Sequence, residues 1–355
     1  MFYICGAKIS NKSSTAKLFC IYFAFSNLLP NFADKTVRQM RRGNVFYHLT
    51  AFVVVVIWGS TFVFTKLLLQ EGLSPALIFT LRFIIAYVLL AAYQLFLLSP
   101  LLCKTVCANT RPHRLFCKSW KDELLMLALG VTGGSVYFLT ENAAMLYTTA
   151  TNTSLIVCSC PLFTMLLVAL FYRKTERFTR RQVTGSLMAC LGMAVVVLNG
   201  HFVLHLSPLG DLLAFAACLL WALYSLLMIP ANQKYDALFI TRKVFFYGLL
   251  TMIPYYLCNP AELEAFISHF SASHFALPVL WNLLYLGVIA SMGCFLVWNW
   301  VIRRLGAVEA TNWVYINPVS TILFAWWLLS EHITVWFLLG TILILVGMYF
   351  CDKKK

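Results

Sequence analysis

Ten stretches of mostly apolar residues, separated by short polar segments, fill the chain after residue 47. Each stretch is near the roughly 20 residues that an α-helix needs to cross about 30 Å of hydrocarbon at 1.5 Å per residue. The pattern predicts an all-α membrane protein with ten transmembrane helices. The predicted helices cover residues 48–70, 74–98, 122–145, 148–171, 181–199, 207–230, 236–257, 278–302, 307–330 and 332–351.

Residues 1–47 stand outside this pattern. Their apolar patch at 18–29 is too short to span a bilayer, and Ser26, Asn27 and Pro30 interrupt it. We interpret residues 1–47 as an N-terminal extension that is poorly ordered or dispensable, because Met40 and two arginines stand directly before the first predicted helix like a natural start. A signal peptide is the alternative, since three lysines precede the patch.

Composition and charge indicate a membrane protein with a defined orientation. Hydrophobic residues make up 61% of the chain and charged residues 11%, whereas a soluble domain is roughly 45–50% apolar. The net charge of +14 does not indicate a nucleic-acid partner, because the basic residues lie between apolar runs. With the N-terminus inside, 25 of the 27 lysines and arginines fall in cytoplasmic segments, and the other two, Lys66 and Arg82, lie within helices. The positive-inside rule therefore predicts a multi-pass protein of the cell (inner) membrane with both termini cytoplasmic.

A set of landmarks in residues 130–192 returns in the same order at residues 287–347. The matched pairs are Gly130 and Gly287, Pro161 and Pro318, Glu176 and Glu331, Gly185 and Gly340, and Gly192 and Gly347. We infer two repeats of five helices each, residues 48–200 and 207–351. Because five is an odd number, the second repeat must cross the membrane in the opposite direction to the first. Inverted repeats of this kind are typical of secondary transporters that work by alternating access.

Several segments resemble the drug/metabolite transporter superfamily, in its ten-helix EamA-type branch. The matching segments are Trp58-Gly59-Ser60-Thr61-Phe62 with Lys66, Pro75 with Arg82-Phe83, Cys160-Pro161-Leu162-Phe163-Thr164, and Asn317-Pro318. The resemblance runs from about residue 48 to 350. It implies a transporter that exports or imports small metabolites through a cavity lined by the first four helices of each repeat, with the fifth and tenth helices peripheral. The second repeat differs from the first, because Ile229 stands where Lys66 would fall.

Three charged residues inside the predicted helices are candidates for substrate binding. Arg82 lies about eight residues into its helix, where an arginine costs on the order of 2.5–3.5 kcal/mol on insertion scales unless a partner compensates it. Arg82 faces the cavity and pairs with a carboxylate of the protein or the substrate, or it forms a structural pair, or its side chain reaches the outer interface. Lys66 has the same alternatives near the end of its helix. Glu141 is the obvious counter-charge: it neutralises Arg82, titrates as a coupling-proton site, or faces the outer water.

The other candidates for the cavity are polar and aromatic. Asn142 and Asn299 occupy equivalent places in the two repeats, and such amides either bond between helices or contact a substrate. Trp58, Tyr137 and Trp298 belong to a set of aromatic residues that form cavity walls or pack in the core. A further candidate is Asn312, which lies in the polar first turns of the ninth predicted helix.

Prolines and glycines mark special places in the helices. Pro161 and Pro318 stand near mid-membrane, where a proline removes a backbone hydrogen bond and kinks the helix. The freed carbonyl groups either face the substrate or accompany a static kink. The spacing of seven residues within each late glycine pair puts both glycines on one helix face for close packing. The packing partner is a helix of this chain or of a second protomer, so a homodimer stays open.

These features predict a secondary transporter that moves a small polar or amphipathic metabolite, amino-acid-like or drug-like, across the cytoplasmic membrane by alternating access. The expected partners are that small-molecule substrate, the lipid bilayer and, if Glu141 titrates, a coupling proton. No cofactor or metal is expected: His201 and His205 have the i, i+4 spacing of metal ligands but stand alone, and no glycine-rich phosphate cradle occurs. A membrane-embedded enzyme or a receptor with a polytopic helical fold is the alternative.

Overall fold

The computed structural model describes residues 45–98, 116–148, 150–172, 179–198, 207–262, 264, 277–329 and 335–352. The predicted N-terminal extension lies almost wholly outside these residues, as do Glu176, Glu331, His201 and His205. The described residues from Tyr47 onward belong to one compact unit. Every regular element among them is a helix, which confirms the predicted all-α class.

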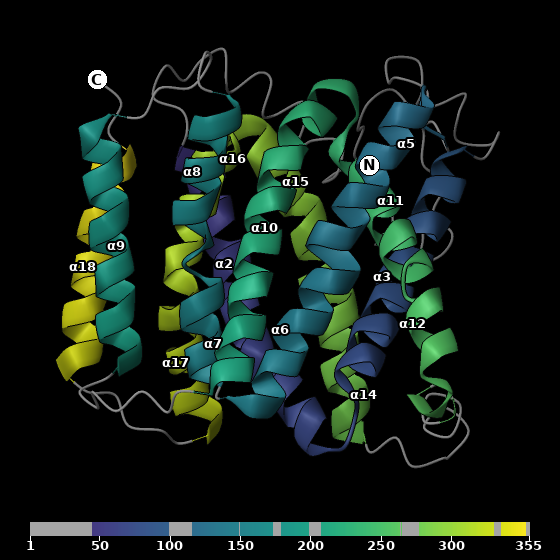
Figure 1. Cartoon of the computed structure of the whole chain (residues 1–355), viewed down its shortest axis with the longest axis horizontal. Coiled ribbons are helices and arrows are strands. Elements are labelled where there is room, and N and C mark those ends of the chain that lie inside the picture. The colour runs from purple at the N-terminus through teal and green to yellow at the C-terminus, as the bar shows by residue number, and fades with distance from the viewer. Residues whose placement is uncertain are drawn as a thin grey trace, which may run out of the picture. The chain divides into compact units, whose positions relative to one another are not determined.

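Figure 1 shows the arrangement of the helices in the described part of the chain. The first predicted repeat contains α2 (Val45–Gln70), α3 (Pro75–Leu98), α5 (Trp120–Gly130), η2 (Val131–Ser135), α6 (Val136–Tyr147), α7 (Ala150–Val157), α8 (Cys160–Phe171) and α9 (Arg180–Leu198). The second contains α10 (Pro208–Lys234), α11 (Ala237–Leu250), α12 (Ile253–Cys258), α14 (Leu277–Leu284), η3 (Tyr285–Gly293), α15 (Cys294–Leu305), α16 (Ala307–Thr311), η4 (Asn312–Ile316), α17 (Asn317–Leu329) and α18 (Val335–Asp352).

A helix or a run of joined helices lies over each of the ten predicted ranges. Within the described part of the chain, seven of these runs are long and apolar enough to cross a membrane. The other three are α9, the run from α16 to α17, and α18. The number of ten crossing helices therefore stays a prediction. One predicted boundary is early, because α10 continues through Pro230 to Lys234 rather than ending at residue 230.

Pro161 and Pro318 lie where the fourth and ninth predicted helices are interrupted. α7 ends at Val157 and α8 begins at Cys160, with Pro161 in its first turn. Pro318 is the second residue of α17 and follows the 3₁₀ segment η4. A proline has no N–H to donate to the carbonyl four residues before it, and its ring clashes with that carbonyl. The α-helix is interrupted just before each of these two prolines, whereas α10 continues through Pro230 to Lys234.

The third and eighth predicted helices are each irregular near the middle. η2 joins α5 to α6 through a kink, where Gly134 has the non-helical angles φ −128° and ψ −109°, and η3 is a π-helical segment that joins α14 to α15. Glycines allow close helix crossings here: a Cβ placed on Gly130 would lie 2.6 Å from the Cβ of Tyr247, and one placed on Gly287 would lie 2.8 Å from the Cβ of Ile85. Because π-helical segments in α-helices are frequent at functional sites, η3 directs attention to α3, the helix that it crosses.

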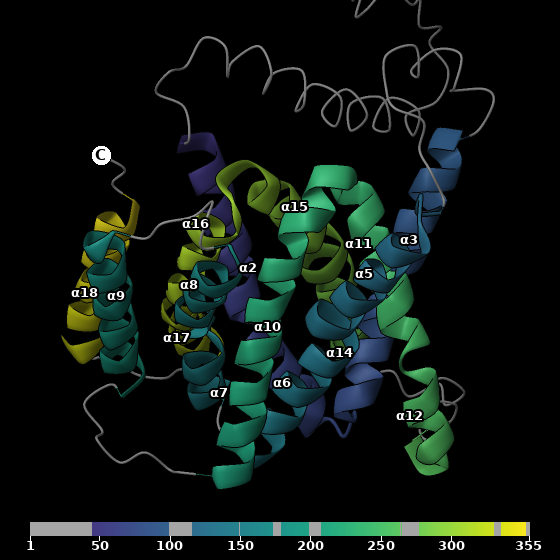
Figure 2. The ribbon, with the colours of Figure 1, turned by 45° about the horizontal axis from the view of Figure 1, so that its top comes forward.

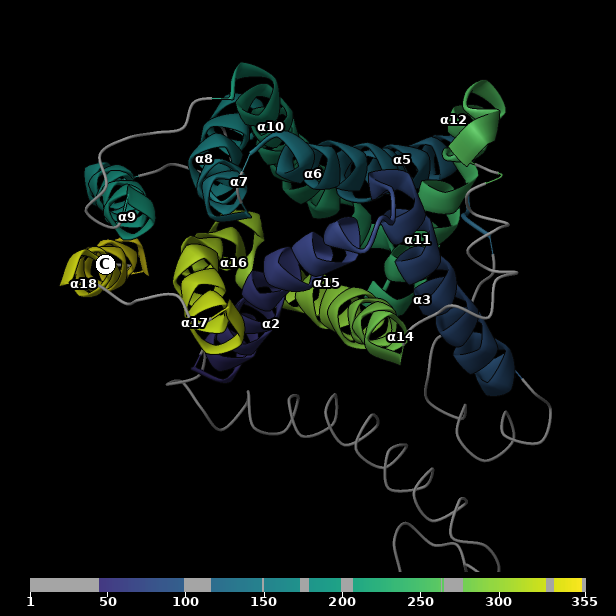
Figure 3. The same ribbon diagram turned by 90° about the horizontal axis from the view of Figure 1, so that it is seen from below.

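α9 and α18 pack side by side at one edge of the unit, as the resemblance led us to expect of the fifth and tenth helices (Figures 2 and 3). A Cβ on Gly185 would lie 2.7 Å from the carbonyl oxygen of Gly347, and a Cβ on Gly192 would lie 2.8 Å from that of Gly340. Only glycine fits at such a separation. The glycine pairs thus find their partner within this chain, and a second protomer is not needed to explain them.

Candidate functional site

A narrow cavity lies between helices of the two predicted repeats. Its free volume is about 30 Å³, room for on the order of one or two water molecules. The lining residues are Trp58, Thr61, Phe62, Arg82, Tyr137, Phe138, Glu141, Val157, Cys160, Trp221, Phe295, Val314 and Asn317. They come from α2, α3, α6, α7, α8, α10, α15, η4 and α17. The cavity is therefore lined by the first four predicted helices of the first repeat, as the resemblance implies, and by the sixth, eighth and ninth predicted helices. No described residue of the seventh, which the resemblance also implies, lines it.

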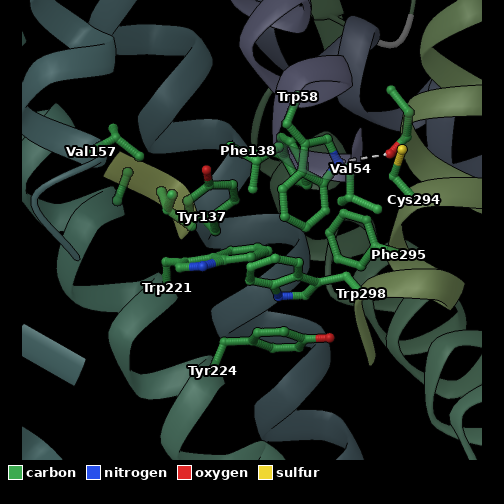
Figure 4. Close-up of a cluster of buried hydrophobic side chains, with 14 of the residues drawn as sticks. Val54, Trp58, Tyr137, Phe138, Val157, Trp221, Tyr224, Cys294, Phe295 and Trp298 are labelled. Atoms are coloured by element: carbon green, nitrogen blue, oxygen red, sulfur yellow. Dashed lines mark hydrogen bonds between the residues drawn. The ribbon is translucent and has the colours of Figure 1, made fainter. Parts of the chain in front are cut away.

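A cluster of aromatic rings forms one wall of the cavity (Figure 4). The ring centroid of Trp58 lies 5.3 Å from that of Trp221, 5.6 Å from that of Phe295 and 5.0 Å from that of Trp298. The indole Nε1 of Trp58 donates a hydrogen bond to the carbonyl oxygen of Ala290 in η3 at 3.0 Å. This bond joins α2 to the π-helical segment of the other repeat and fixes the orientation of the central ring.

Arg82 faces the cavity from α3, and its side chain and backbone are only 2% exposed. Its Nε donates to Oγ of Ser291 in η3 at 2.8 Å, and its guanidinium carbon lies 4.5 Å from the ring centroid of Phe138. Of the ion pairs that the described residues form within 4.0 Å, none includes Arg82. Arg82 is thus a buried cation that one hydroxyl and one aromatic ring hold in place, with no carboxylate directly bonded to it.

Glu141 lies in the same cavity without bonding to Arg82. Its Oε1 accepts a hydrogen bond from the hydroxyl of Tyr137, one helical turn earlier on α6, at 2.7 Å. Glu141 is 7% exposed and also lines the cavity. The sequence predicted that Arg82 and Glu141 lie in one region, and this placement agrees. The ion pair between Glu141 and Arg82, which was one alternative, is not formed among the described residues.

Lys66 does not line the cavity. Its Nζ donates to the carbonyl oxygen of Met145 at 2.7 Å. That carbonyl belongs to the last turn of α6, where the helix dipole favours a cation and where the final carbonyl groups have no partner within the helix. The structure therefore gives Lys66 a structural position at a helix end.

The predicted asparagines lie outside the cavity as well. Nδ2 of Asn142 donates to the carbonyl oxygen of Pro75 at 3.2 Å. Asn299 accepts from the hydroxyl of Tyr224 at 2.6 Å and donates to Oγ1 of Thr241 at 2.8 Å. Both amides form hydrogen bonds between helices, which is one of the two roles predicted for them; the other was contact with a substrate. Asn312 borders a separate hollow beside α18, and Trp298 packs behind the cavity wall against Trp58.

The two prolines influence the cavity through the residues that precede them. Val157 and Val314 each stand four residues before a proline, and both line the cavity. Their carbonyl groups are the ones that Pro161 and Pro318 leave without the usual helical donor. Among the described residues, no three histidine, cysteine, aspartate or glutamate side chains gather to hold a metal ion. The cavity therefore offers hydrogen bonds, charge and aromatic packing.

Several lining residues were missed as cavity candidates because they carry no charge, although Cys160 and Asn317 belong to segments that match the family. They follow the repeat: Phe138 and Phe295, Val157 and Val314, and Cys160 and Asn317 are each separated by 157 residues, the same offset as the landmark prolines. Once the first residue of each pair is known to line the cavity, adding 157 to its number gives the second. Ser291 was also missed, because its role depends on a contact with Arg82, 209 residues away.

The charges of the cavity come from one repeat only. Arg82 and Glu141 both belong to the first, and the residue 157 positions after Glu141 is Trp298. The cavity wall is therefore built by equivalent residues of both repeats, while its charge is not. This asymmetry agrees with the sequence difference between Lys66 and Ile229.

Comparison with known proteins gives a match to one protein family and to a solved structure. A model of the EamA-like transporter family matches residues 45–198 and, a second time, residues 208–351. A solved crystal structure superposes with a TM-score of 0.62 at 19% sequence identity, covering 87% of this chain and 98% of the other, which shows a shared fold.

Similar proteins of known name are transporters. A protein of Archaeoglobus fulgidus named an uncharacterized transporter is 28% identical over 316 residues, 87% of this chain and 98% of that protein. A probable terminal-alkyne amino-acid exporter of Streptantibioticus cattleyicolor is 26% identical and aligns with 65% of this chain and 74% of its own length. A probable amino-acid metabolite efflux pump of Salmonella typhimurium is 27% identical, with 84% of this chain and 92% of its own length aligned.

Proposed function

This chain belongs to the EamA-like transporter family, and on that premise we propose that it is a secondary carrier that moves a small amphipathic metabolite across the cytoplasmic membrane by alternating access. The observation that carries the proposal is the cavity between the two regions that the family model matches, with a buried arginine in it. Family membership favours a carrier over the membrane-embedded enzyme and the receptor.

Contacts between equivalent residues support two halves, 48–200 and 207–351, related by a pseudo-two-fold axis. Phe138 and Phe295 are equivalent, and their ring centroids lie 6.2 Å apart. The equivalent glycines also meet corresponding helices, because Gly130 meets Tyr247 of α11, the second helix of its half, and Gly287 meets Ile85 of α3, the second helix of the other half. A contact and its equivalent occur together when an axis of symmetry runs between the halves. Such an axis in the membrane plane is the arrangement of inverted-repeat carriers.

The direction of equivalent helices supports the inversion. In Figure 1, α7 lies toward one end of the unit and α8 toward the other, whereas the equivalent run begins with α16 at the end of α8 and finishes with α17 at the end of α7. The fourth and ninth crossings therefore run antiparallel to each other. With the positive-inside rule, this arrangement gives both termini a cytoplasmic location.

The narrowness of the cavity supports a conformational cycle. Sites for small molecules usually have volumes of about 300–1,000 Å³, whereas the free volume here is about 30 Å³. A metabolite enters only when the halves move apart and the aromatic wall opens. Rocking one half against the other would open the cavity to one side at a time.

The residues of the cavity suit a substrate that has a carboxylate group and an apolar or aromatic side chain. Arg82 presents a planar fork that matches a carboxylate with two hydrogen bonds, and it has no protein carboxylate bonded to it. Glu141 provides a second charge of opposite sign for an ammonium group, and the rings of Trp58 and Trp221 provide the apolar wall. The names of two relatives refer to amino acids or their metabolites. We therefore propose an amino-acid-like substrate.

Transport by purified protein in proteoliposomes tests the proposal, with phenylalanine as the probe and phenethylamine, which lacks the carboxylate, as its comparison. We expect saturable uptake of phenylalanine and weak uptake of the amine. Arg82→Ala should raise KM for phenylalanine roughly tenfold or more, because a hydrogen bond to a charged group is worth about 1.5–3 kcal/mol. Arg303→Ala is the matched control, since Arg303 is exposed at the end of α15.

An imposed proton gradient in the same assay tests coupling at Glu141. If Glu141 is the coupling-proton site, the gradient accelerates uptake by the wild type but not by Glu141→Gln. Equal KM values for the wild type and Arg82→Ala, in protein that elutes as a single folded species, would remove the carboxylate from the proposal. Absence of any saturable uptake of either probe would contradict the amino-acid-like substrate itself.

A further inference from the structure

Two ion pairs join the repeats at one end of the unit, outside the cavity. Nζ of Lys243 lies 2.8 Å from Oε1 and 2.9 Å from Oε2 of Glu123, and the hydroxyl of Tyr247 donates to Oε2 at 2.5 Å. The backbone N–H of Cys117 donates to Oε1 at 2.9 Å. Four hydrogen bonds therefore hold the carboxylate of Glu123, and three of them come from α11 of the second repeat.

The neighbouring acid is held in the same manner. Asp122 accepts a hydrogen bond from Nζ of Lys234 at 2.5 Å and another from the hydroxyl of Tyr235 at 2.9 Å. The two pairs differ in exposure: the side chain of Lys234 is 54% exposed, whereas that of Lys243 is 7% exposed. Because water screens exposed pairs, the pair of Glu123 and Lys243 is the stronger one.

Among the residues that the structure describes, no ion pair joins α14 to α3 at the equivalent place at the other end. Adding the repeat offset of 157 to Asp122 and Glu123 gives Val279 and Leu280 in α14. Within the described residues, the polar contacts between repeats toward that end include hydrogen bonds from Ser74 to Glu262 at 2.5 Å, between Thr80 and Tyr256 at 2.8 Å, and between Ser135 and Thr251 at 2.7 Å. α5 and α11 lie together at the predicted cytoplasmic end, and α14 lies at the opposite end (Figure 1).

We infer that Glu123, Lys243 and Tyr247, with Asp122 and Lys234, form a latch that closes the cytoplasmic end of the carrier. The inference rests on the proposed alternating access. In an inverted-repeat carrier the two halves exchange conformations, so the contact of α5 with α11 loosens when the contact of α14 with α3 tightens. Opening to the cytoplasm then breaks the ion pairs, whereas opening to the outside breaks no equivalent pair. The latch therefore favours a resting state that is closed to the cytoplasm.

Access to Cys160 from the cytoplasmic side tests this latch without any substrate. Cys160 lines the cavity, and a variant that keeps Cys160 as its one cysteine reports when the cytoplasmic path is open. Inside-out vesicles expose that path to a membrane-impermeant maleimide. We expect Glu123→Gln to label roughly tenfold faster than the parent. Loss of the charge pair shifts the equilibrium between the closed and the cytoplasm-open states by about that factor. The exchanged pair, Glu123→Lys with Lys243→Glu, should return the rate toward that of the parent.

Controls separate a moving latch from a static one. Arg303→Gln changes an exposed charge at the same predicted end and should leave the labelling rate unchanged. If Glu123→Gln does not fold, Tyr247→Phe removes only the hydroxyl donor and should give a smaller increase. An unchanged rate in folded Glu123→Gln, or in Tyr247→Phe when the former is not obtained, would overturn the latch. If Glu123→Gln labels faster but the wild type does not take up phenylalanine, the latch is supported and only the proposed substrate is contradicted.

Discussion

The crossing of η3 over α3 at Gly287 gives a sharp test of how the cavity is held. A Cβ at this position would lie 2.8 Å from Cβ and from Cγ2 of Ile85, about 0.6 Å closer than the 3.4 Å at which ordinary contacts begin. Gly287→Ala should therefore push η3 away from α3 by about that distance. Ser291 lies one helical turn further along η3, so its 2.8 Å bond to Arg82 would stretch to about 3.4 Å, beyond the usual range.

The expected result has two parts. Overpacking typically lowers the free energy of unfolding by about 1–3 kcal/mol, which thermal denaturation in detergent measures. Losing a hydrogen bond that orients a charged group removes a further interaction of about 1.5–3 kcal/mol, so KM for phenylalanine should rise roughly tenfold in folded protein. Gly293→Ala is the matched control in the same segment, because the nearest atom to its Cβ would be 3.5 Å away. Identical behaviour of the two variants would refute the reasoning.

Two further variants test the positions outside the cavity. Gly192→Val should lower the free energy of unfolding by about 1–3 kcal/mol, because its Cβ would lie 2.6 Å from N of Ile344. Since α9 and α18 are peripheral, uptake per folded molecule should not change, and a loss of uptake in folded protein would contradict this. Lys66→Gln keeps a donor for the carbonyl of Met145, so KM for phenylalanine should stay at the wild-type value; an increase like that of Arg82→Ala would return Lys66 to the cavity.

Much of the fold follows from the sequence, because a bilayer allows few alternatives. An apolar run of about 20 residues has to satisfy its backbone groups internally, so its length and its α-helical state follow together. The breaks at Pro161 and Pro318 also follow from local chemistry, since proline cannot donate. The kink in η2 and the π-helical segment η3 were not predicted, because neither stretch contains a proline.

The site was predictable to a smaller extent. Arg82 and Glu141 were found because charge inside an apolar helix is costly wherever it faces. Lys66 carries the same signal but lies near a helix end, where the carbonyl of Met145 accepts its ammonium group, and sequence alone did not distinguish the two situations. Ser291 carries no signal of its own: a serine in a membrane helix is ordinary until its partner is known.

The restriction of charge to one repeat has a consequence for how such genes diversify. Under the proposed function, substitutions at Arg82 or Glu141 would alter which substrate is attracted, while Trp221 and Phe295 of the other repeat keep their part of the wall. A few changes confined to one half would then be enough to turn the preference toward acids, amines or neutral compounds.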